Sequence, residues 1–200
     1  MTKDETIREI HHRVKNNLQT VSALLRLQSR RSSEEAVKVA LAEAERRVQA
    51  IATVHAALSQ NVDESVDFDE VARTIVRMAG AIASTDHAVE VITTGSFGTI
   101  QADQAQALAT VLNELVANSV EHGLADRDGL IEVRAEREGT SMTVTVADNG
   151  VGFVPGTPMS GLGTQIVHQM VRGELKGSIE WAPREGGGTL VTLHANLDPA

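Results

Sequence analysis

The first sixty residues alternate apolar and polar positions with the period of an α-helix. Between residues 6 and 31 the apolar side chains recur every three or four positions without a Pro or Gly, which predicts one long helix. A second helix, to about Ser59, has an apolar seam close to a heptad repeat, and Ser32 with Glu35 can form a capping box at its start. Two helices joined by a short turn make an antiparallel hairpin with one apolar face. Because a lone hairpin cannot bury that face, we expect it to dimerise into a four-helix bundle.

Beyond the hairpin the pattern changes to a mixture of helices and short strands. Residues 61–65 are polar and acidic, so we place a boundary between a helical domain of residues 1–62 and a second domain of residues 63–200. The second domain is expected to contain helices at 68–83, 103–121 and 162–171, and strands at 89–93, 131–137, 142–147, 178–181 and 189–194. Helices grouped with hairpin-linked strands predict an α+β sandwich, with the helices on one face of a mixed sheet.

The composition limits the classes of function. The 200 residues include 42% hydrophobic but only 2% aromatic residues, which predicts an aliphatic core, and their formal net charge is −9. An acidic chain without a basic stripe argues against nucleic-acid binding. The absence of cysteine excludes disulfides, and no apolar run approaches the roughly 20 residues of a membrane span. We therefore expect a soluble cytoplasmic protein, with no nucleic-acid or membrane partner in this segment.

A polar stripe lies on the helix predicted at 103–121. Glu114, Asn118 and His122 follow one another at intervals of four, which puts all three on one helix face. The carboxamide can ligate a hard cation such as Mg²⁺, the carboxylate can orient a water or accept a proton, and the imidazole can donate to a phosphate oxygen. The alternative is a solvated helix face that ends at His122, and this stripe alone does not decide between the two.

Two pairs of glycines follow that helix. Asp148 ends a predicted strand, and a buried carboxylate there can accept a hydrogen bond from the exocyclic amine of adenine, while Gly150 and Gly152 let the backbone approach the ring. The segment Gly161-Leu162-Gly163 precedes a helix and can present amide N–H groups and a positive helix end to phosphates. Ordinary turns explain either pair alone. The order of these elements after Asn118 is far more specific, and it predicts a nucleotide site.

Two adjacent histidines lie on the first helix. With Ile7 as the reference and about 100° per residue, His11 falls at the edge of the apolar stripe and His12 almost opposite it. We expect His11 to be packed and hydrogen-bonded, and His12 to project into solvent, where another domain can reach it. Most histidines on helices have no catalytic function, and the helical phase by itself does not exclude that reading.

The second domain resembles a known nucleotide-binding domain. Residues 65–195 are similar to the GHKL, or Bergerat, ATP-binding domain shared by histidine kinases, Hsp90, type II topoisomerases and MutL proteins. The resemblance implies that Asn118 binds Mg²⁺, that Asp148 binds adenine, and that the hydroxyl of Thr189 supports the adenine pocket. It departs from the family in its lid, because only residues 153–160 separate the two glycine pairs.

The first helix resembles a phosphoacceptor segment. The run from His11 to Gln19 is similar to the box of the HisKA_2 class, a relative of the HWE kinases, in which the His before an Arg is phosphorylated. This implies phosphorylation of His12, with Asn16 placed to position a water or the acceptor and Glu9 placed to hold the other ring nitrogen. The acid that directly follows the His in the commoner box is absent here, which leaves Glu9 and Glu114 as candidate bases.

Together the two resemblances imply the catalytic core of a cytosolic sensor histidine kinase. It would bind ATP with Mg²⁺, phosphorylate itself on His12, and pass the phosphoryl group to an Asp of a response-regulator receiver domain. Within the family, the His11–Arg31 helix resembles actinobacterial kinases that signal to RNA-binding antiterminator regulators. No sensor segment precedes the hairpin, so we expect either that the chain is part of a longer protein or that the sensor is a separate protein, and we favour the former.

Three other functions are compatible with parts of the pattern. An anti-sigma-factor serine kinase has the same ATP domain but normally lacks the two-helix hairpin, so residues 6–59 argue against it. An Hsp90- or MutL-like ATPase would hydrolyse ATP as part of a larger clamp. A catalytically silent dimer scaffold would not need the full set of motifs. The sequence leaves open whether phosphoryl transfer occurs within one chain or across a dimer.

Overall fold

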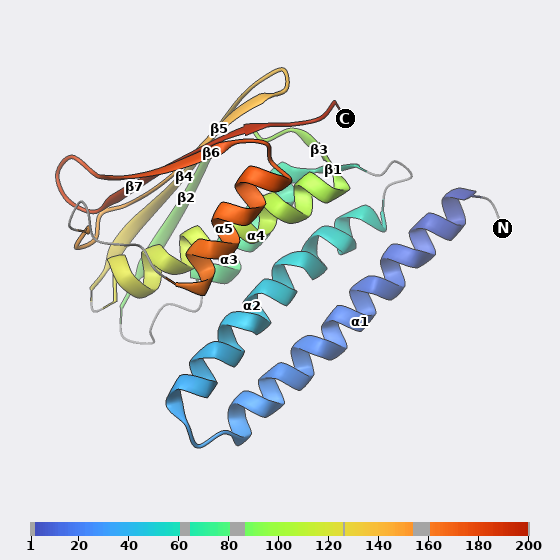
Figure 1. Cartoon of the computed structure of the whole chain (residues 1–200), viewed down its shortest axis with the longest axis horizontal. Helices are drawn as coiled ribbons and strands as arrows, with labels where there is room; N and C mark the ends of the chain where they lie inside the picture. The colour runs from blue at the N-terminus through green and yellow to red at the C-terminus, as the bar shows by residue number, and fades with distance from the viewer. Residues whose placement is uncertain (1–2, 61–64, 81–86, 126, 154–160, 200) are drawn as a thin grey trace.

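A computed structural model describes residues 3–60, 65–80, 87–125, 127–153 and 161–199. Helix α1 (Lys3–Arg31) and helix α2 (Glu35–Leu58) form an antiparallel hairpin that lies against an α+β lobe, with α2 between α1 and the lobe (Figure 1). The boundary expected between residues 62 and 63 lies outside the described residues, as do the end of the helix predicted at 68–83 and most of the short lid.

The lobe is built from three helices, one π-helical turn and seven strands within the described part of the chain. In order they are β1 (Ser65–Asp67), α3 (Phe68–Gly80), β2 (Val89–Gly95), β3 (Thr99–Gln101), α4 (Ala102–Asn118), η1 (Ser119–Gly123), β4 (Gly129–Glu138), β5 (Ser141–Asp148), α5 (Leu162–Gly173), β6 (Ser178–Pro183) and β7 (Thr189–Asn196).

The hairpin is held together by a ladder of polar contacts between its two helices. Ser22 is buried and accepts a 2.6 Å hydrogen bond from the Gln49 carboxamide. Four apolar side chains of α1 remain more than two-fifths exposed, namely Ile10, Val21, Leu24 and Leu27. The capping box expected at the start of α2 is not formed, because the Ser32 hydroxyl accepts from the Glu34 amide and Glu35 pairs with Lys38.

The main sheet has five strands in the order β2-β4-β5-β7-β6. Strand β2 pairs with β4 in parallel, and the other three pairs are antiparallel, so the sheet is mixed as predicted. Helices α3, α4 and α5 cover one face of the sheet (Figure 1). The small sheet of β1 and β3 was not predicted; its strands are three residues each.

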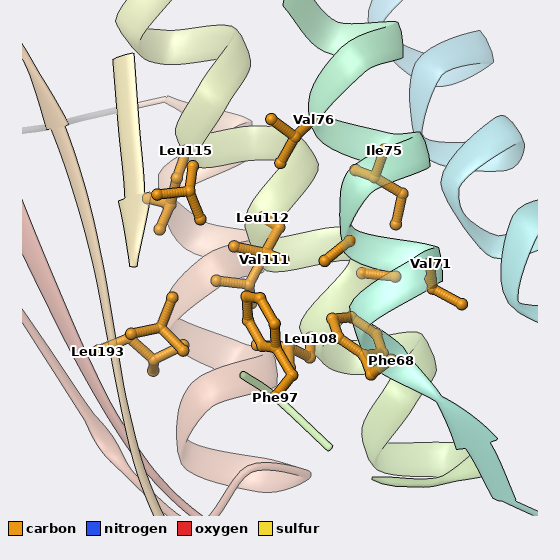
Figure 2. Close-up of a cluster of buried hydrophobic side chains, with 14 of the residues drawn as sticks. Phe68, Val71, Ile75, Val76, Phe97, Leu108, Val111, Leu112, Leu115 and Leu193 are labelled. Atoms are coloured by element: carbon orange, nitrogen blue, oxygen red, sulfur yellow. The ribbon is translucent and has the colours of Figure 1, made fainter. Parts of the chain in front are cut away.

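The core lies between these helices and the sheet, and it is aliphatic, as the composition predicts. Figure 2 shows α4 contributing Leu108, Leu112 and Leu115 to this layer, opposite side chains of α3. Two of the three phenylalanines of the sequence, Phe68 and Phe97, are fully buried there, with ring centroids 5.3 Å apart. This packing fixes α4 rigidly against the sheet, and α4 carries the polar stripe singled out above.

Helix α4 is followed directly by a turn with a different hydrogen-bonding pattern. This π-helical turn spans Ser119–Gly123, where the Leu124 amide donates to the Ser119 carbonyl at 2.9 Å. A π turn contains one more residue than an α turn, and such turns occur frequently at functional sites. Its effect here is to change the direction of His122 relative to the α-helical face that carries Glu114 and Asn118.

Candidate nucleotide-binding site

A cleft of about 280 Å³ opens beside the C-terminal half of α4. It is bounded by η1, the end of β5, the start of α5, parts of β6 and β7, and one side of α2. The structure brings together nine of the predicted site residues in its lining: Glu114, Asn118, His122, Asp148, Gly152, Gly161, Leu162, Gly163 and Thr189.

Asp148 forms one end of the cleft, where β5 stops. Its side chain is 2% exposed, and its Oδ1 accepts hydrogen bonds from the amides of Gly150 at 2.9 Å and Thr189 at 3.2 Å. Two donors on one oxygen fix the plane of the carboxylate. They leave Oδ2 as the oxygen that can accept from a ligand in the cleft.

The two glycines of the first pair have different surroundings. Gly150 does not line the cleft, and a Cβ added to it would overlap the Gly123 carbonyl, so the absence of a side chain permits the loop to pack on η1. Gly152 does line the cleft and has φ of 69°, a conformation that favours glycine. The close approach to a ring that we expected of both glycines stays a prediction; Gly152 lines the cleft, whereas Gly150 packs on η1.

Another part of the cleft wall is formed by the start of α5. Gly161 is the N-cap residue, and the first intrahelical hydrogen bond joins the Gln165 amide to the Gly161 carbonyl at 3.1 Å. The amides before Gln165 therefore have no acceptor within the helix, which makes this end a suitable site for an anion. A Cβ on Gly163 would lie 2.4 Å from Oε2 of Glu114, so a side chain there would require the Glu114 carboxylate to move.

Two arginines of α2 also line the cleft, and the sequence analysis missed both. Arg47 binds Glu114 through two parallel contacts, Nε to Oε1 and Nη2 to Oε2, each 2.9 Å long. Arg46 forms a 2.7 Å ion pair with Glu121. Burial lowers the pKa of the Arg47 guanidinium, but the hydrogen bonds and charge of Glu114 outweigh burial and place the pKa above its ordinary value. Adjacent arginines on a helix do not reveal their partners, so no sequence signal could have assigned them.

Trp181 is a further lining residue that the sequence analysis did not single out. It lies on β6 and is the only tryptophan in the chain. Its ring centroid is 5.2 Å from that of His168 on α5. An aromatic ring in the wall of a nucleotide cleft provides apolar surface for a base. Its fluorescence can also serve to report on ligands that enter the cleft.

The two histidines of α1 are oriented as the helical phase predicted. His12 is exposed, whereas the Nδ1 atom of His11 lies 3.0 Å from Nδ1 of His55 on α2. The Asn16 carboxamide contacts Nδ1 of His12 at 3.3 Å. Glu9 does not hold the ring of His12 as we expected, because its carboxylate pairs with Arg13 at 2.7 Å.

The exposed histidine and the cleft are not in contact in this structure. None of the described residues that line the cleft belongs to α1, and the hairpin faces the cleft through α2. The carboxylate of Glu114, one of the two candidate bases, is bound to a guanidinium. His12, Glu9 and Asn16 thus form one group on α1, and the nucleotide-site residues form a second group in the lobe.

Comparisons with known proteins match two consecutive segments of the chain. Residues 9–82 match a family model described as histidine kinase, and residues 103–199 match one described as histidine kinase-, DNA gyrase B-, and HSP90-like ATPase. The sensor histidine kinase PdtaS of Mycolicibacterium smegmatis is 46% identical over 98% of this chain, and the chain spans 40% of that protein's length. Blue-light-activated histidine kinase 2 of Erythrobacter litoralis is 28% identical over 97% of the chain and 58% of its own length.

Solved structures show the same arrangement of elements. The histidine kinase domain of an Erythrobacter litoralis blue-light-activated kinase superposes with a TM-score of 0.69, at 22% identity, and the match covers 98% of this chain and 96% of that one. At this identity the likeness shows the fold alone. None of the helices in the described ranges combines the length and apolar character that crossing a membrane requires.

The fold and the cleft define the lobe as an ATP-binding domain of the GHKL class, joined to a two-helix hairpin. With both parts matched over most of its length, the chain belongs to the sensor histidine kinases.

Proposed function

We propose that this chain binds ATP with Mg²⁺, transfers the γ-phosphoryl group to His12, and then passes it to an aspartate of a response-regulator receiver domain in the cytoplasm. The observation that carries the proposal is a cleft lined by both a buried acid and the unpaired amides of a helix start. It occurs together with an outward imidazole on the adjoining hairpin.

The cleft suggests one orientation for the nucleotide. Oδ2 of Asp148 accepts a hydrogen bond from the exocyclic amine of adenine, and Trp181 supplies apolar surface beside the base. The phosphates then extend past Asn118 toward the amides at Gly161–Gly163. The imidazole of His122, exposed at the π turn, can donate to a phosphate oxygen.

The described residues fit a magnesium ion that comes with the nucleotide. They contain no group of three His, Asp or Glu side chains that could hold a metal without other ligands. Mg²⁺ is usually bound by one or two protein oxygens together with substrate phosphates and water. The carboxamide oxygen of Asn118, at the middle of the cleft, is the protein ligand that we assign to it. The ion would neutralise phosphate charge during transfer.

The chemistry at His12 needs one free ring nitrogen. For Nε2 to attack, Nδ1 must carry the ring hydrogen. The Asn16 carboxamide then rotates by 180°, so that its oxygen accepts a hydrogen bond from Nδ1–H. The Nε2–P bond forms as the bond from the γ-phosphorus to the bridging oxygen breaks, which releases ADP. The Nδ1 proton then leaves to a base, for which Glu9 and Glu114 stay the candidates. A receiver carboxylate later attacks the phosphorus, and the P–Nε2 bond breaks as Nδ1 takes up a proton again, which restores the neutral imidazole.

Transfer also requires that His12 and a cleft come together. Either the lobe moves against its own hairpin, or the cleft receives His12 from a second copy of the chain. The exposed apolar residues of α1 support a homodimer through the hairpin, because a second hairpin would bury them.

The direct test is to identify the residue that becomes phosphorylated when the protein is incubated with Mg²⁺ and ATP. Phosphohistidine at position 12, found by mass spectrometry under alkaline handling, is the expected result. An anti-sigma-factor-type serine kinase would instead leave the chain unlabelled and produce acid-stable phosphoserine on a partner, which would replace our proposal.

A further inference from the structure

The charges that line the cleft are unevenly distributed between lobe and hairpin. A triphosphate normally needs Lys or Arg side chains to neutralise it. Among the described residues that line the cleft, the only Lys or Arg side chains are Arg46 and Arg47, and both come from α2. The amino-acid sequence of residues 154–160, between the two glycine pairs, contains no Lys or Arg either. The lobe thus leaves this role to the hairpin.

The two arginines stand where the terminal phosphate would arrive. A Cβ on Gly163 would lie 3.6 Å from Nη2 of Arg47, so this guanidinium is next to the start of α5. Arg47 is 14% exposed and Arg46 is 13% exposed, and each is paired with a carboxylate that lines the cleft. A carboxylate and a phosphate present similar pairs of oxygens to the fork of a guanidinium. Glu114 therefore occupies the position on Arg47 that a phosphate can take.

We propose that Arg47, with Arg46 beside it, binds the γ-phosphate of ATP, so that the hairpin completes the site and makes it specific for a triphosphate. The inference rests on the proposed function. On ATP binding, the γ-phosphate replaces Glu114 on Arg47. ADP ends one phosphate earlier, and leaves Arg47 bound to Glu114. The exchange also releases both oxygens of the Glu114 carboxylate from the guanidinium, while the Asn113 carboxamide still donates to Oε1 at 3.3 Å.

The experiment compares the affinities of the whole chain for Mg²⁺–AMP-PNP and Mg²⁺–ADP by titration calorimetry. Removal of Arg47 alone would leave Glu114, which is 6% exposed, as an unpaired buried charge. The informative pair is therefore Glu114→Gln against the double variant Arg47→Ala/Glu114→Gln, in which neither protein holds that charge. We expect the double variant to bind AMP-PNP about tenfold to a hundredfold more weakly than Glu114→Gln, with ADP affinity changed by less than about twofold.

Two more variants sharpen the comparison. Arg47→Lys/Glu114→Gln keeps the positive charge but loses the fork, and should fall between Glu114→Gln and Arg47→Ala/Glu114→Gln in its preference for AMP-PNP. Arg26→Ala is the matched control, because Arg26 pairs with Glu45 within the hairpin at 2.9 Å and does not line the cleft. It should leave both affinities unchanged.

The outcomes separate this inference from the function on which it rests. Equal losses of AMP-PNP and ADP binding in the double variant, or no loss of either, would overturn the role of Arg47 while leaving ATP binding intact. A wild-type chain that binds neither nucleotide would refute the proposed function, and this inference with it. A selective loss of AMP-PNP affinity also in Arg26→Ala would show that hairpin stability, and not contact with the phosphate, sets the preference.

Discussion

His11 and His55 face each other across the hairpin, with their Nδ1 atoms 3.0 Å apart and their ring centroids 5.2 Å apart. At that distance one nitrogen donates and the other accepts, so the two rings share a single proton between them. The contact fixes the rotation of α1 about its axis. Because His12 follows His11 by one residue, the same contact turns His12 toward solvent.

The shared proton makes the hairpin sensitive to acid. Burial, with a smaller contribution from the charge of His11, holds the pKa of His55 below the ordinary imidazole value of 6.5. The stability that the neutral His55 contributes is therefore fully present above about pH 6.5 and is lost as the pH falls from there through the lower pKa of the folded protein. We expect the melting temperature of the wild type to fall between about pH 7 and pH 5.

The variant His55→Gln should show a smaller fall over the same interval, because it has no ring to protonate at that position. Thermal unfolding, monitored by circular dichroism at several pH values, measures the melting temperatures of the wild type and the variant. Parallel curves for the wild type and the variant would mean that the acid sensitivity comes from other groups.

Because His11 and His12 point in different directions, we expect opposite effects when each is replaced. His12→Gln should abolish acid-labile, base-stable label from γ-labelled ATP, since no other nucleophile replaces the outward imidazole. His11→Gln should keep a large part of the label, because glutamine can still donate to His55. Label retention is measured on gels after acid and alkaline treatment. Equal loss in both variants would contradict the assignment of distinct roles to the two rings.

Magnesium binding through Asn118 can be tested by nucleotide binding as well as by phosphorylation. Asn118→Ala should shift the Mg²⁺ dependence of AMP-PNP binding to higher metal concentration, and it should abolish self-labelling, because the ion loses its protein oxygen. Affinity for the nucleotide in the presence of chelator should change little. If the Mg²⁺ dependence of the variant equals that of the wild type, Asn118 is not the ligand.

Asp148 should determine affinity for the base. Asp148→Asn turns an acceptor into an amide, so we expect ATP affinity to fall by about tenfold to a hundredfold, as for a lost hydrogen bond to a charged group. Fluorescence of Trp181, in the wall of the same cleft, offers a direct titration. Asp198→Asn is the control, since Asp198 pairs with Lys176 on the surface. Unchanged affinity in the Asp148 variant would remove it from the adenine site.

Much of this architecture could be predicted from periodicity. Long helices and hairpin-linked strands repeat their pattern many times, so α1, α4 and the pair β4 and β5 were found close to their observed bounds. The three-residue strands β1 and β3 are too short to show a period. The π turn after Asn118 has no signature in the apolar pattern, because it is a change of hydrogen bonding and not of composition.

The residues of the candidate site also fall into two groups, those that the sequence predicts and those that only the structure reveals. Asp148, Asn118 and the glycines of the second pair could be located because their order along the chain is specific. The contact of Arg47 with Glu114 joins residues 67 positions apart and belonging to different parts of the chain. Such a pairing depends on how the hairpin lies against the lobe, which no local pattern encodes. The residues that link the two parts were therefore the ones that the sequence analysis missed.

The packing of Gly150 on η1 gives a prediction that concerns stability first and binding second. Gly150→Ala would place a methyl group against the Gly123 carbonyl, so either the loop or the π turn must shift. Overpacking of this kind typically costs about 1–3 kcal/mol, and we expect the free energy of unfolding of the lobe to fall by that amount. Gly173→Ala, at the end of α5, is the matched control, because nothing lies within 4 Å of a Cβ there. Chemical denaturation measures both variants. If Gly150→Ala is as stable as Gly173→Ala, the close contact between this loop and the π turn does not constrain the folded protein.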